Sequence, residues 1–251
     1  MKRETLIVGF FFLIMCSLLI VFAPDGLSML FVIIQSVLML LGFVFGILKT
    51  SRFSRAFQVA QYNIHEIKKE IQTDDIWLPV SRQDKLFQLE ALDRVFAEYK
   101  DNVTKRKSDG KAILPDIEDL INEDQVSIKT TRNTINQIPE TLTGIGILGT
   151  FVGLIIGVGS IGFSSVAAAI TSLQSLINGI EIAFYTSIVG IILSICFNLT
   201  YKFVWNIMLR DMFIFIDDFH KNVIPSEEVQ MRDLESNFYA TMLSKYQAKE
   251  Q

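Results

Sequence analysis

The chain has 251 residues, 50% of them hydrophobic, and its 23 basic and 27 acidic residues give a formal net charge of −4 at pH 7. A net negative charge argues against direct binding of nucleic acid, which needs a basic surface. The hydrophobic fraction alone does not separate soluble from membrane proteins, so the placement of the apolar residues along the chain decides the class.

Four apolar blocks without any Asp, Glu, Lys or Arg predict four membrane-spanning helices, because a bilayer core needs about 20 apolar residues per helix. The blocks are residues 5–23, 29–48, 141–180 and 182–201. The third block is long enough for a helix followed by an uncharged connection. A signal peptide is the alternative for the first block, but the apolar run is too long, no small-residue cleavage site follows, and a second span comes at once.

The basic residues around these blocks predict the orientation of the spans. They gather on one side, at Lys2, Arg3, Lys49, Arg52, Arg55, Lys202 and Arg210. The other side has only the turn at 24–28 and the uncharged residues 160–178. By the positive-inside rule, both termini then lie in the cytoplasm. Cys16 and Cys196 fall within spans, where we expect them to pack rather than to form a disulfide or bind a metal.

The polar residues between the second and third spans are expected to form a helical cytoplasmic region. The run "FQVAQYNIHEIKKEI" continues the second span, and "WLP" at 77–79 breaks it, since proline cannot continue a helix. Apolar residues at helical spacing predict a face packed on a neighbouring helix, namely Leu86, Leu89, Leu92, Phe96 and Tyr99. "KRKSDGKAILPD" is expected to be a loop.

These patterns divide the chain into four parts. They are a transmembrane hairpin over 1–50, the cytoplasmic helical region over 51–139, the channel-forming spans over 140–205 and a cytoplasmic tail over 206–251.

The sequence has no signature of an enzyme. His65 and His220 are isolated, no cluster has metal-ligand spacing, and no nucleophile elbow, P-loop or dinucleotide fingerprint is present. We therefore expect no catalytic residues, no metal and no cofactor. The basic run Lys105–Lys107 is interpreted as part of a solvated loop rather than a nucleic-acid surface.

The third span, which contains "TLTGIGILGTFVGLIIGVG", has glycines along one side instead of bulky residues. Offsets of four, three and four place Gly146, Thr150, Gly153 and Gly157 on one stripe of a helix, and Gly149 lies four residues before Gly153. The fourth span repeats these offsets at Ala183, Ser187, Gly190 and Ser194. Small residues let membrane helices approach closely.

Two interpretations of these stripes stay open. One is ordinary helix packing, with the hydroxyls bonded to their own backbone. The other is a wall that receives a helix of another protein, in which Thr150 and Ser187, both near mid-membrane, serve an ion-carrying group. Because the spans contain no deep charge, that titrating group would have to come from a partner.

Two segments, "GILGTFVGLIIGV" and "EIAFYTSIVGIILSI", resemble the MotA/TolQ/ExbB ion-channel family, as does the layout of hairpin, cytoplasmic region and two further spans. The form "IPETLTGIGILGTFVGL", with the Thr-Ser pair of the fourth span, is most similar to the channel subunits of anti-phage defence systems. The resemblance covers the membrane core. It implies an all-α integral membrane protein that forms an ExbB/MotA-like pentamer in the bacterial inner membrane.

The same resemblance implies partners and a function. The pentamer would surround two copies of a MotB/ExbD-like single-pass subunit with a membrane aspartate, and passage of H⁺, or of Na⁺, would drive rotation. We expect a stator of an ion-driven motor in anti-phage defence, with a cytoplasmic nuclease or helicase as candidate effector. The alternatives are an energiser of outer-membrane transport or flagellar rotation, and a non-conducting membrane scaffold.

The resemblance also carries roles to single residues. The family's threonine of the third span falls on Thr150, whereas on the fourth span Thr186 and Ser187 compete and the stripe favours Ser187. The residues expected at helix-packing or partner-facing positions are Gly146, Gly149, Gly153, Gly157 and Gly190, and Glu181 is the candidate acid at the outer mouth. Thr143 stands where flagellar stators have proline, and Cys196 stands where many relatives have proline, so we do not expect the hinge geometry of those relatives to carry over to this chain. The tail after the fourth span is either naturally short or truncated.

Overall fold

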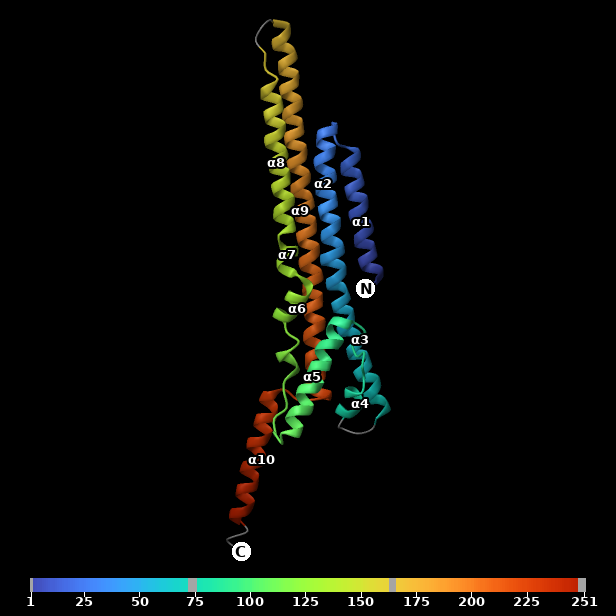
Figure 1. Ribbon diagram of the computed structural model, residues 1–251, viewed down its shortest axis with the longest axis vertical. Helices are drawn as coiled ribbons and strands as arrows, with labels where there is room; N and C mark the ends of the chain where they lie inside the picture. The colour runs from blue at the N-terminus through green and yellow to red at the C-terminus, as the bar shows by residue number, and fades with distance from the viewer. Residues whose placement is uncertain (1, 72–75, 163–165, 248–251) are drawn as a thin grey trace. The chain divides into compact units, whose positions relative to one another are not determined.

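The computed structural model describes residues 2–71, 76–162 and 166–247, and every regular element in these ranges is a helix (Figure 1). The helices are α1 (Lys2–Val21), α2 (Gly26–Gly42), the π-helix η1 (Phe43–Leu48), α3 (Lys49–Glu70), α4 (Trp77–Ser81), α5 (Glu90–Ser108), the 3₁₀ helix η2 (Ile117–Asp119), α6 (Glu123–Thr130), α7 (Arg132–Asn136), α8 (Ile138–Gly159), α9 (Val166–Asn222) and α10 (Glu227–Gln247). The all-α class expected from the sequence is confirmed.

The chain divides into two compact units. The apolar unit comprises Met1–Ser51 and Thr130–Asn206, and the polar unit comprises Arg52–Lys129 and Ile207–Gln251.

Three helical stretches in the described ranges are long and apolar enough to cross a membrane. They are Gly26–Glu70, which joins α2, η1 and α3, Arg132–Gly159, which joins α7 and α8, and Ser172–Lys245, which covers most of α9 and α10. The first predicted span corresponds to a shorter apolar helix over Thr5–Val21. The helix that starts at Gly26 runs without a break to Glu70, so the second span continues into the polar sequence as expected. The expected break at "WLP" is wrong, because this helix already ends at Glu70 and "WLP" begins α4. Three stretches of sufficient length thus support a membrane protein. That the shorter helix over Thr5–Val21 also crosses the membrane stays a prediction.

The turn between α1 and α2 is defined by its cap. Asp25 precedes α2 in an extended conformation, and its carboxylate accepts hydrogen bonds from the backbone N–H of Ser28 at 2.9 Å and of Leu27 at 3.3 Å. These bonds satisfy donors that the first helical turn cannot satisfy itself. The hairpin therefore turns where the sequence "PDG" predicts it.

The connection between α8 and α9 is shorter than the uncharged stretch 160–178 suggested. α8 ends at Gly159 and α9 begins at Val166, then continues for 57 residues to Asn222. The sequence from residue 166 to Asn222 has no proline, and its only glycines are Gly179 and Gly190. Isolated glycines cost a helix only about 1 kcal/mol each, which packing outweighs. The fourth span therefore extends as one helix beyond both of its expected ends.

The segment "KRKSDGKAILPD" is only partly a loop, so that expectation needs correction. α5 includes its first four residues and ends at Ser108. Gly110 has φ of 68°, and Lys111 donates its backbone N–H to the carbonyl of Arg106 at 3.1 Å. A glycine in the left-handed region is the usual way to end a helix, so the position of Gly110 sets the boundary.

The core of the polar unit is aromatic. Phe87 packs on Phe215 with ring centroids 4.9 Å apart, and Tyr99 packs on Phe219 at 5.6 Å. Four of the five residues of the predicted stripe are fully buried here, namely Leu86, Leu92, Phe96 and Tyr99. The expected packing of that stripe is thereby confirmed, with Leu89 half-buried at the N-cap of α5.

Candidate functional site

The glycines of α8 form a face that lies directly against α9. Gly146, Gly149, Gly153 and Gly157 are all buried. A Cβ atom added to Gly153 would lie 2.6 Å from the carbonyl oxygen of Gly179 and 2.8 Å from the backbone nitrogen of Ala183. These are distances that real Cβ atoms do not tolerate, so the two backbones touch because the side chains are absent. In Figure 1, α8 and α9 run side by side over the length of α8.

The contact continues towards both ends of α8. A Cβ atom on Gly157 would lie 3.2 Å from the carbonyl oxygen of Leu176, and one on Gly146 would lie 3.1 Å from that of Thr186. Gly179 takes part from the α9 side, since its own Cβ would lie 2.6 Å from the Cα of Gly157. The sequence interpretation missed Gly179, although it lies four residues before Ala183 on the predicted stripe. The two small-residue stripes therefore meet each other within one chain.

The three candidate hydroxyls lie in different surroundings within this contact. Thr150 is half-buried, and its hydroxyl donates either to the carbonyl of Ala183 across the helix pair at 3.1 Å or to that of Gly146 at 3.2 Å. Thr186 is fully buried against Gly149 and donates to its own helix, at Ile182, 2.9 Å away. Ser187 is half-buried, and its hydroxyl forms no hydrogen bond with any described residue.

These positions differ in what they offer to another molecule. A threonine hydroxyl has one proton and two lone pairs. Thr186 is covered on all sides, so its hydroxyl serves the helix interior. Thr150 and Ser187 each keep part of their surface open, so they are the two hydroxyls of this set that an added helix or ion could reach.

Gln35 on α2 is a polar residue that the sequence interpretation missed. It has no exposed surface, and its amide nitrogen lies 3.4 Å from the carbonyl oxygen of Thr186 and 3.5 Å from that of Leu142. A Cβ atom on Gly190 would lie 2.8 Å from this nitrogen, so Gly190 makes room for it. The amide oxygen of Gln35 has no partner among the described residues. The available signal was that Gln35 is the single amide in an otherwise apolar span.

The outer faces of α8 and α9 are apolar and exposed in the single chain. On α8 they present Ile147, Leu148, Phe151 and Ile155, and on α9 they present Phe184, Ile188, Ile191 and Ile195. Surfaces of this kind face lipid or other subunits. Glu181, the candidate acid, is exposed on α9.

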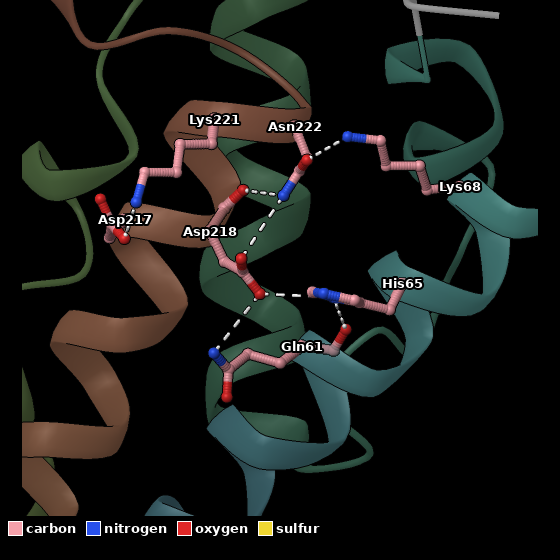
Figure 2. A network of polar contacts seen from close by, with 7 residues as sticks. All are labelled: Gln61, His65, Lys68, Asp217, Asp218, Lys221 and Asn222. Carbon is pink, nitrogen blue, oxygen red and sulfur yellow. Dashed lines mark hydrogen bonds and ion pairs between the residues drawn. The ribbon is translucent and has the colours of Figure 1, made fainter.

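Both histidines, which look isolated in the sequence, pair with aspartates of the polar unit. Figure 2 shows His65 of α3 facing Asp218 of α9, with 3.4 Å between the ring Nδ1 and the carboxylate. In the same view Gln61 donates to Asp218, and the ammonium of Lys68 donates to the amide oxygen of Asn222. The network joins α3 to the last turns of α9 inside the polar unit.

The second histidine holds a carboxylate near the start of α10. The Nε2 of His220 lies 2.7 Å from Asp116, which also accepts hydrogen bonds from the backbone N–H of Glu118 and Glu227. Burial raises the pKa of Asp116, but these hydrogen bonds and the imidazole outweigh it, so the pKa lies below its ordinary value. No group of three or more Cys, His, Asp or Glu in the described part of the chain has the arrangement of a metal site.

The long apolar helices, the close contact between α8 and α9 and the hydroxyls within it define an all-helical membrane protein with its candidate site on these two helices. The family model for "Anti-phage protein ZorA, Zorya type I system" matches residues 17–221, and the chain belongs to this family. The expected resemblance to an anti-phage defence family is thereby confirmed.

A curated relative supports the same assignment. The chain is 41% identical over 71 residues to the Zorya protein ZorA of Escherichia coli (strain Crooks). This match covers 28% of the chain and 12% of the length of that relative.

Proposed function

We propose that the chain is the channel-forming stator subunit of an ion-driven motor in the bacterial inner membrane, and that it acts in anti-phage defence. Membership of the ZorA family supports the defence role. The apolar helices and the positive-inside pattern support the membrane and a cytoplasmic position for both termini. The proposed ion path runs along α8 and α9.

The observation that carries the proposal is the half-buried pair of hydroxyls, Thr150 and Ser187, in helices that lack a deep charge. An ionised carboxylate brought into the membrane costs several kcal/mol unless polar groups reach it. The proton of the Thr150 hydroxyl is used by a carbonyl, Gly146 or Ala183, so its lone pairs remain to accept from a protonated carboxyl or to contact a cation. Ser187 is able to donate as well as accept.

The proposed partner is a ZorB-like, single-pass subunit with a membrane aspartate. Five copies of the chain would surround two copies of this subunit, with the apolar outer faces of α8 and α9 forming the contacts between subunits and with lipid. Identical subunits form closed rings when one interface repeats. The aspartate would carry H⁺, or coordinate Na⁺, as it passes Thr150 and Ser187.

The test is ion flux in liposomes that contain the chain together with its partner subunit. We expect Thr150→Ala and Ser187→Ala to reduce flux and phage protection strongly while assembly, checked by size-exclusion chromatography, is retained. Thr200→Ala is the matched control, because that hydroxyl donates to its own helix at Cys196, 2.7 Å away. Thr186→Ala separates the two registers of the fourth span.

Two outcomes would contradict the proposal. If Thr150→Ala and Ser187→Ala conduct as well as Thr200→Ala, the hydroxyls are structural and the non-conducting scaffold is favoured. If Thr186→Ala abolishes flux while Ser187→Ala is silent, the ion path uses the buried hydroxyl and the register is wrong by one residue.

A further inference from the structure

A polar pocket of about 440 Å³ lies in the apolar unit, where α8 begins and the apolar run of α9 ends. Its walls carry two cations and three amides, contributed by Arg132, Lys202, Asn136, Asn198 and Asn206. Glu140 is the single acidic residue in the wall. The lining therefore has a net positive charge and several N–H donors.

The two cations of this pocket are held differently. The guanidinium carbon of Arg132 lies 4.2 Å from the ring centroid of Trp205, which is 2% exposed. Stacking on an aromatic face orients a guanidinium within the wall. Lys202 is exposed and forms no ion pair with a described residue. One cation is thus fixed by the fold, and the other is able to adjust to a ligand.

The pocket lies beside an apolar surface of the same helix. Leu199 and Phe203 of α9 are 65% and 66% exposed, and each follows a residue of the pocket wall, Asn198 or Lys202, by one position. Neighbouring positions on a helix are about 100° apart, so the polar wall and the apolar side chains adjoin. The tyrosine and tryptophan of the wall suit the boundary between membrane and water.

We propose that this pocket binds the phosphate headgroup of an anionic membrane lipid. Arginine, lysine and amide N–H groups are the donors that phosphate oxygens require, and basic pockets between membrane helices on the cytoplasmic side are suited to such headgroups. Free phosphate shares this chemistry. The lipid is the favoured source because Leu199 and Phe203 provide a surface for an acyl chain directly beside the pocket.

The test measures lipid-dependent stabilisation of the full chain in neutral detergent. Phosphatidylglycerol, phosphatidylcholine and inorganic phosphate are titrated in separate arms, and the apparent affinity is read from the thermal shift. The variants are Lys202→Gln and Arg132→Gln, with Lys49→Gln as the matched control for a cation outside the pocket. Glu140→Gln removes the acid from the wall and tests whether the loss of a negative charge strengthens the binding of an anionic headgroup.

We expect phosphatidylglycerol to stabilise the chain more than phosphatidylcholine. Each pocket cation lost should weaken the apparent affinity for phosphatidylglycerol roughly five-fold, given the usual contribution of a basic residue near an anionic membrane. Lys49→Gln should leave it unchanged, and Glu140→Gln should strengthen it. Lys202→Gln carries the test alone if Arg132→Gln fails to fold, because Lys202 is an exposed side chain.

Three results would overturn the proposal. The first is equal stabilisation by the two lipids. The second is an equal loss of affinity in Lys49→Gln and Lys202→Gln, which would mean diffuse attraction to the membrane surface. The third is stabilisation by inorganic phosphate that matches phosphatidylglycerol, which would assign the pocket to a soluble phosphate ligand.

Discussion

Gly153→Ala is the sharpest perturbation of the contact between α8 and α9. The added Cβ would lie 2.6 Å from the carbonyl oxygen of Gly179, which is about 0.8 Å short of ordinary van der Waals contact at 3.4 Å. The neighbouring atoms are backbone, so no rotamer change relieves the clash and the helices must separate. Overpacking of this kind typically costs about 1–3 kcal/mol.

The matched control is Gly144→Ala on the same helix, where an added Cβ meets nothing within 4 Å. Alanine has a higher helix propensity than glycine by about 1 kcal/mol, so Gly144→Ala should be neutral or stabilising. Because both variants gain this propensity, we expect the thermal midpoint of Gly153→Ala in detergent to lie roughly 2–12 °C below that of Gly144→Ala, at about 2–4 °C per kcal/mol for a chain of this size. Gly153→Leu should fail to assemble. Equal stability of Gly153→Ala and Gly144→Ala would refute the close contact.

Two further predictions concern single polar residues. Gln35→Met keeps the side-chain volume but removes an amide whose oxygen is buried without a described partner. Thermal unfolding should therefore show a stability change within about 1 kcal/mol. A loss above about 3 kcal/mol would mean that the amide ties α2 to α9 strongly. The pKa of Asp116 is lower in the folded chain than in the unfolded chain, where an aspartate has a pKa of about 4. The ionised carboxylate therefore stabilises the fold above about pH 4, and this stabilisation is lost as the pH falls through the folded pKa. Thermal midpoints from pH 6 to pH 3 should therefore converge for the wild type and Asp116→Asn, and a constant difference would contradict the assignment.

The sequence predicted the helical class and the small-residue stripes, because hydrophobic blocks and offsets of three and four are local properties. It did not determine that the glycine face of α8 lies against α9 of the same chain, since a stripe shows that a helix packs closely but not on what. Gln35 shows the same limit: its place in an apolar span was visible, whereas its contact with the Thr186 carbonyl depends on which faces of three helices meet. The pairing of His220 with Asp116 joins residues 104 positions apart and has no local signal.

The length of α9 was underestimated for a different reason. A fall in hydropathy after Tyr201 marks the edge of a span, but it does not end a helix. Only a breaker or a cap does so, and α9 continues until "NVIPS" provides a proline three residues beyond Asn222. Hydropathy therefore located the membrane segment, whereas the position of proline located the end of the helix.

The central claim is that the ion-carrying group comes from a partner and that this chain supplies the hydroxyls around it. The direct measurement is proton flux into liposomes that contain the chain alone, the chain with its single-pass partner, or the chain with a partner whose membrane aspartate is changed to asparagine. We expect flux only with the intact partner, because the described spans carry no deep charge of their own. Flux from the chain alone, or undiminished flux with the asparagine partner, would contradict the claim.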